Sequence, residues 1–109
     1  KRLKEEIEKY TLFYSLVLFG SYVDNKYTKN SDLDVCILIS DKSQKNSIKI
    51  AVNTASNSSI LDLDVHIFTF EEFMSMLKDE SENLGKQIAR KNRAAHNINI
   101  FYKFIKRGF

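Results

Sequence analysis

Two segments of this 109-residue chain share a pattern that strongly limits its fold, because apolar side chains take every second position in each. The first segment runs from Asp32 to Ile39 and the second from Leu61 to Phe68. A period of two residues is that of a β-strand with one buried face, so both segments are predicted to be strands. The apolar rows are Leu33, Val35, Ile37 and Ile39 in the first, and Leu61, Leu63, Val65 and Ile67 in the second.

The segments around these strands have the three- and four-residue spacing of amphipathic helices. Thr69 can cap the helix that follows the second strand. A short apolar run over 15–19 stops at Gly20, which predicts another strand that ends in a tight turn. Helices are predicted over 2–13, 42–55, 70–77, 81–92 and around 100–105, with a short extended piece at 94–96. Strands that alternate with helices predict the α+β class, with helices packed mainly on one face of the sheet.

Length and composition favour one globular domain over residues 1–109. Cys36 is the only cysteine, which excludes an internal disulfide and a cysteine-based zinc cluster. No apolar run reaches the roughly 18 residues of a membrane span, so we expect a soluble, cytoplasmic protein. The chain opens at Lys1 inside a helical pattern, which suggests a missing N-terminal segment. The net charge of +3 permits an anionic ligand, but nucleic-acid binding is not implied by charge alone.

Acidic side chains begin both predicted strands. Asp32 and Asp34 are two residues apart, so they project from one face, about 7 Å apart by strand rise. Asp62 and Asp64 share a face in the second strand, and alternation cannot choose between them. Clustered carboxylates repel one another unless cations bind, and oxygen ligands of this kind suit Mg²⁺. Paired divalent ions would favour phosphoryl or nucleotidyl transfer.

Gly20 and Ser21 stand where the predicted strand ends and a short helix or turn begins. Glycine lets the backbone approach a phosphate closely, and the free N–H groups of a helix start attract an anion. The Ser21 hydroxyl adds a donor. The turn is therefore a candidate site for a triphosphate tail.

The order of these features resembles a known family. The sequence GSYVDNKYTKNSDLD over 20–34 is similar to the Gly-Ser, ten residues, Asp-x-Asp signature of the polymerase-beta-like nucleotidyltransferase superfamily, and to its minimal prokaryotic members in particular. The sequence DLDVHIFTFEEF over 62–73 resembles the third-aspartate strand of that family and the helix after it. The resemblance covers most of the chain from Leu16 onward.

The resemblance implies a palm with a mixed β-sheet. It implies two Mg²⁺ ions held by Asp32, Asp34 and Asp64, with Gly20 and Ser21 at a nucleoside triphosphate, most simply ATP. The family transfers a nucleoside monophosphate to a hydroxyl, here of a protein or small-molecule acceptor. Minimal members often act beside a helical, HEPN-type partner as toxin-antitoxin pairs, which makes an antitoxin-like role the specific expectation. A homo-oligomer is also compatible with the small size.

Two departures from the family pattern are the basis of an alternative to an active transferase. Asn25 stands where many relatives have a second glycine, and Asp24 is acidic where relatives are often basic. The alternative is therefore a catalytically degenerate module that binds a nucleotide or a protein. His66 is interpreted as structural, and the basic residues from Lys86 to Arg93 as a helix face and a candidate basic contact.

Overall fold

The computed structural model describes residues 2–23, 32–57 and 62–108. Asp24, Asn25 and Leu61, which the sequence interpretation uses, lie outside the described residues. The helices are α1 (Arg2–Ile7), α2 (Lys45–Asn57), α3 (Phe70–Lys78), α4 (Leu84–Arg90) and α5 (Ile98–Gly108), with 3-10 turns η1 (Gly20–Tyr22) and η2 (Lys42–Gln44). The strands are β1 (Tyr14–Phe19), β2 (Leu33–Ile39), β3 (Leu63–Thr69) and β4 (Arg93–His96). No helix in the described part of the chain is long and apolar enough to cross a membrane.

The strands form one mixed sheet in the order β3-β2-β1-β4. β1 is antiparallel to both β2 and β4, whereas β2 and β3 are parallel. The long connection through α2 is what allows β2 and β3 to run in the same direction. The α+β class and the mixed sheet are thus confirmed, and the short extended piece at 94–96 is part of edge strand β4.

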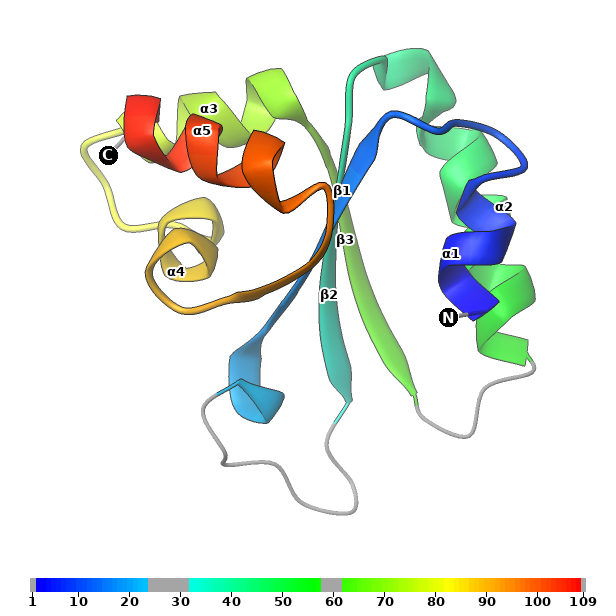
Figure 1. Cartoon of the computed structure of the whole chain (residues 1–109). Coiled ribbons are helices and arrows are strands. Elements are labelled where there is room, and N and C mark those ends of the chain that lie inside the picture. Colours follow the sequence, from blue (N-terminus) through cyan, green and yellow to red (C-terminus); the bar gives the residue numbers. More distant parts are fainter. Residues whose placement is uncertain (1, 24–31, 58–61, 109) are drawn as a thin grey trace.

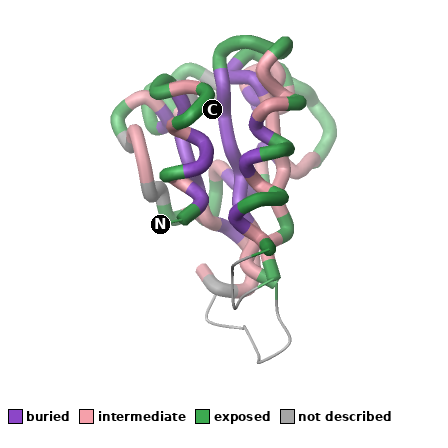
Figure 2. Tube along the Cα trace, turned by 90° about the vertical axis from the view of Figure 1, so that its right-hand side faces the viewer, coloured by how far each residue is buried: buried purple, intermediate pink, exposed green. Residues whose placement is uncertain are grey.

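Helices cover both faces of the sheet, which corrects the expectation that they lie mainly on one (Figure 1). α1 and α2 pack on one face through Ile7 and Ile48, and α3, α4 and α5 pack on the other. The physical reason lies in β2, where Cys36 and Leu38 alternate with the expected apolar row and are fully buried as well. A strand that is apolar on both sides needs cover on both sides. Figure 2 shows the resulting buried stretches running between exposed outer turns.

The first helix is shorter than predicted. It ends at Ile7, whereas the apolar spacing extends to Phe13. The backbone N–H of Phe13 donates to the hydroxyl of Thr11 at 3.2 Å, and such a local side-chain bond competes with helical hydrogen bonding. Phe13 instead lies against Phe70, with ring centroids 5.5 Å apart.

A capping box starts α3, as the position of Thr69 predicts. The Thr69 hydroxyl accepts from the Glu72 N–H at 3.0 Å, and the Thr69 N–H donates to the Glu72 carboxylate at 2.9 Å. We expect Thr69→Ala to lower the free energy of unfolding by about 1 kcal/mol, the usual cost of losing such a cap. Urea unfolding measures this, with Thr54→Ala as the control. Thr54 is exposed inside α2 and only back-bonds to Ile50, so equal losses in both variants would contradict the assignment.

Candidate active site

β1 ends, and β2 and β3 begin, at the same end of the sheet (Figure 1). The acidic residues lie at or next to these strand starts. Asp34 is the direct partner of Asp64 across the parallel pair and of Phe19 across the antiparallel pair. Asp34 is half-buried, while Asp32, just before β2, and Asp64 are exposed. The register between β2 and β3 sets Asp64, and not Asp62, directly beside Asp34. Asp62 precedes β3, and its carbonyl accepts a hydrogen bond from the N–H of Leu33 at 2.9 Å.

Gly20 is pressed against Asp34 in a conformation that only glycine adopts readily. Its φ is +79°, in the left-handed region. A Cβ atom added at Gly20 would lie 2.0 Å from Oδ2 of Asp34, far inside contact distance. The glycine is thus required by the close approach of the turn to the carboxylate.

The turn after Gly20 is shorter than a helix. Gly20–Tyr22 form one 3-10 turn, closed by the N–H of Val23 donating to the Gly20 carbonyl at 3.1 Å. A single turn has no helix macrodipole of the kind that attracts phosphate, so the N–H groups and the half-buried Ser21 are what this turn offers an anion.

The Asp34 carboxyl lies in an environment that disfavours its charge. Burial raises the pKa of Asp34 above the ordinary aspartate value, and the charge and hydrogen bonding of Asp64 raise it further. Asp32 acts in the same direction, and His66 opposes them. Repulsion between neighbouring carboxylates is what a bound cation would relieve.

His66, which the sequence analysis interprets as a structural residue, lies close to the acidic residues. Its Nε2 lies 3.6 Å from Oδ2 of Asp64. Its ring also lies near the ring of Phe19, with centroids 5.8 Å apart, and stacks with Phe68 at 6.4 Å. His66 therefore has both a packing role and a place beside the carboxylate pair.

A hollow of about 580 Å³ opens beside the turn. Gly20 and Asp34 form part of its wall, and Gln87, Arg90 and Lys91 of the α4 region form another part. The side chain of Arg90 is held by Glu82 through two bonds of 2.6 and 2.8 Å. The sequence marks the basic residues here as a candidate contact, but Gln87 carries no signal, because only the packing of α4 brings it to this hollow.

The acidic side chains at this end of the sheet are oxygen donors, the ligand type that Mg²⁺ prefers. Within residues 2–23, 32–57 and 62–108, no group of three histidine, cysteine, aspartate or glutamate residues is close enough to hold a metal ion. Two of the expected oxygen ligands, Asp34 and Asp64, are nevertheless neighbours in register, and the pKa of Asp34 is raised by its burial and by Asp64. Hard oxygen donors in this state fit a divalent cation such as Mg²⁺.

Comparison with known proteins gives the family that the sequence resembles. Residues 1–95 match the family model described as "Nucleotidyltransferase domain". The chain therefore belongs to the nucleotidyltransferase domain family, a polymerase-beta-like family, and the resemblance found in the sequence is confirmed. A search of curated proteins gave no match.

The fold is shared with a solved structure. It is described as "Crystal structure of the toxin-antitoxin with AMP-PNP", and the similarity has a TM-score of 0.60 at 14% sequence identity. The match covers 98% of this chain and 81% of that chain. At this identity the likeness establishes the fold alone.

Proposed function

We propose that the chain is a Mg²⁺-dependent nucleotidyltransferase that moves a nucleoside monophosphate, AMP from ATP, to a hydroxyl of a protein or small-molecule acceptor. Family membership supports nucleotidyl transfer as the reaction class. The observation that carries the proposal is the register of Asp34 with Asp64 beside a glycine that has no room for a Cβ atom.

In this proposal Asp32, Asp34 and Asp64 hold two Mg²⁺ ions, and Gly20 and Ser21 receive the triphosphate. Bound Mg²⁺ supplies charge neutralisation at the phosphates and lowers the pKa of the acceptor hydroxyl. The acceptor oxygen bonds to the α-phosphorus as the bond to the bridging oxygen breaks, and pyrophosphate leaves. Asp64 is the exposed member of the pair, so its carboxylate faces an incoming acceptor and takes the hydroxyl proton.

The acceptor in the specific version of this proposal is a helical, HEPN-type partner protein, which the chain modifies as an antitoxin does its toxin. The structure described as a toxin-antitoxin with AMP-PNP supports both the partner and the adenine nucleotide by analogy of fold. The alternative is a module that binds a nucleotide or a protein without turnover. It is favoured by one observation, that the described acidic residues do not converge as a group of three.

Calorimetric titration with a nonhydrolysable ATP analogue, with and without Mg²⁺, tests the site. We expect binding that requires Mg²⁺ and that weakens at least about a hundredfold in the Asp32→Ala, Asp34→Ala double variant, because several charge-assisted contacts are lost together. Asp62→Ala is the matched control, since it removes an exposed aspartate at the same end of the sheet. Unchanged binding in the double variant would show that the nucleotide site lies elsewhere.

A further inference from the structure

Strand β3 is an outer strand of the described sheet, and no described strand pairs with its far edge. The carbonyl of Asp62 points to β2, because it accepts the N–H of Leu33. The N–H and C=O of one strand residue point to the same side, and successive residues alternate. The backbone groups of Leu63, Val65 and Ile67 therefore point to the outer edge.

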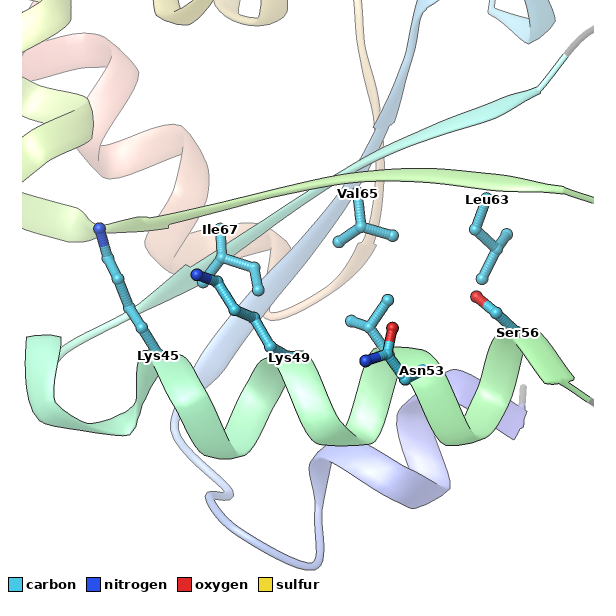
Figure 3. Close-up of a pocket in the computed structure, with 8 residues that line it drawn as sticks. Lys45, Lys49, Asn53, Ser56, Leu63, Val65 and Ile67 are labelled. Carbon is cyan, nitrogen blue, oxygen red and sulfur yellow. The ribbon is translucent and has the colours of Figure 1, made fainter.

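The same three residues line a hollow of about 440 Å³ between β3 and α2 (Figure 3). Leu63, Val65 and Ile67 are only half-buried. Their register partners include Val35 and Ile37 of β2, which are 1% and 0% exposed. The outer strand thus keeps an apolar surface that the rest of the chain, as far as the structure describes it, leaves partly open.

The β3 edge lacks most of the features that usually protect a sheet edge, and its one carboxylate, Asp64, is on the face opposite to the hollow. Natural edge strands are often short, bulged, or interrupted by lysine or proline. The opposite edge has two of these features, since β4 has four residues and its pairing with β1 shifts register. β3 instead has seven residues in unbroken register, and its sequence LDVHIFT contains neither lysine nor proline. Such an edge is suited to pairing with an added strand.

Charge on the α2 rim of the hollow distinguishes between possible partners. The helix carries Lys45 and Lys49 and no acidic residue. Lys45 is neutralised by Glu72 at 2.7 Å, whereas the exposed Lys49 has no ion pair with any described residue. A second copy paired edge to edge would bring two such basic helices together, and like charges repel. An acidic side chain opposite Lys49 would complement the rim.

We propose that the β3 edge and its hollow bind an extended segment of a partner protein, which adds one strand to the sheet. Apolar side chains of the segment lie against Leu63 and Val65, next to Asn53 on the rim. An acidic side chain of the segment meets Lys49, which stands over the Ile67 end of the hollow (Figure 3). This surface is separate from the carboxylates of Asp34 on β2 and Asp64 on β3, which alternate with the apolar row of each strand and so project from the other face of the sheet.

Amide chemical-shift mapping by NMR tests the proposal with a capped peptide, Val-Thr-Val-Thr-Glu-Thr-Glu, and with its reversed sequence, so that both strand directions are covered. We expect one of them to shift the amides of Leu63, Val65 and Ile67. The same peptide with lysine at both glutamate positions is expected to bind roughly tenfold more weakly. No shift in β3 with either direction, or equal binding of the acidic and basic peptides, would overturn the proposal.

Reversing the charge of Lys49 on the rim, and of a lysine elsewhere as a control, tests the role of charge in peptide binding. Lys49→Glu is expected to weaken the acidic peptide about tenfold and to strengthen the basic one. Lys103→Glu, which changes another exposed lysine, on α5, is expected to change neither. Equal effects of the two variants would overturn the role of Lys49. Shifts in β3 that grow with protein concentration in the absence of peptide would show that the occupant is a second copy, which also contradicts the proposal.

Discussion

Asp34→Asn is expected to lower pyrophosphate release from ATP by roughly a thousandfold or more, because a metal ligand supplies several kcal/mol of transition-state stabilisation. Asp34 is the half-buried member of the pair and lies between Gly20 and Asp64, so asparagine keeps its volume while removing its charge. Pyrophosphate release is the measurement, because it reports transfer to any acceptor, water included.

Two further variants sharpen this prediction. Asp64→Asn is expected to behave as Asp34→Asn does, since the two carboxylates are register partners. Asp62→Asn is expected to keep the wild-type rate, although it changes an aspartate only two residues away. A large loss in Asp62→Asn with a normal rate in Asp64→Asn would reverse the assignment of the third carboxylate.

The same Asp34→Asn variant is expected to be at least as stable as the wild type at neutral pH without Mg²⁺. The folded-state pKa of Asp34 is raised, chiefly by burial and then by Asp64. An acid with a raised folded pKa binds its proton more tightly when folded, so the wild type loses stability as pH rises from the ordinary aspartate pKa through the raised one. Chemical unfolding at several pH values should show asparagine abolishing that loss.

Gly20→Ala is the second change with a large expected effect. Alanine at a φ of +79° costs about 1–2 kcal/mol, and its Cβ atom would lie 2.0 Å from Oδ2 of Asp34. We expect a total loss of about 2–4 kcal/mol in the free energy of unfolding, together with loss of Mg²⁺-dependent nucleotide binding. Urea unfolding and calorimetry measure the two effects.

A double variant separates the clash from the backbone strain. In an Asp34→Ala background the carboxylate is gone, and the nearest remaining Asp34 atom is Cβ, 3.1 Å from the added methyl group. Gly20→Ala should therefore cost less in that background, because the backbone strain stays but only a tight contact of 3.1 Å with Cβ replaces the clash with the carboxylate. Equal costs in both backgrounds would mean that Gly20 is not fitted against the carboxylate.

The strands of the site were predictable because the signals that define them lie within each segment of the sequence. Alternation over Asp32 to Ile39 fixes which side chains share a face, and the turn at Gly20 ends β1 where the apolar run stops. Which of Asp62 and Asp64 lies beside Asp34 could not be predicted from the local sequence. It depends on the register between β2 and β3, and a shift of that register would place a different residue beside Asp34.

The sequence analysis predicted helices mainly on one face of the sheet, although the sequence of β2 indicates cover on both faces. Cys36 and Leu38 occupy the second face of β2, and both are apolar enough to require burial. The position of Gln87 beside the site, in contrast, depends on how α4 packs on that second face. Helical spacing places Ile88 inward, but it does not say which part of the sheet the helix reaches.

In the proposed site, Asp34 and Asp64 hold the metal ions for a nucleotide whose phosphates lie at Gly20 and Ser21. Crystals grown with Mn²⁺ and a nonhydrolysable ATP analogue test it most directly, because Mn²⁺ gives an anomalous signal at its own position. We expect anomalous peaks in contact with both carboxylates and a triphosphate against the Gly20 turn. A nucleotide bound away from this end of the sheet, or Mn²⁺ held by other side chains, would contradict it.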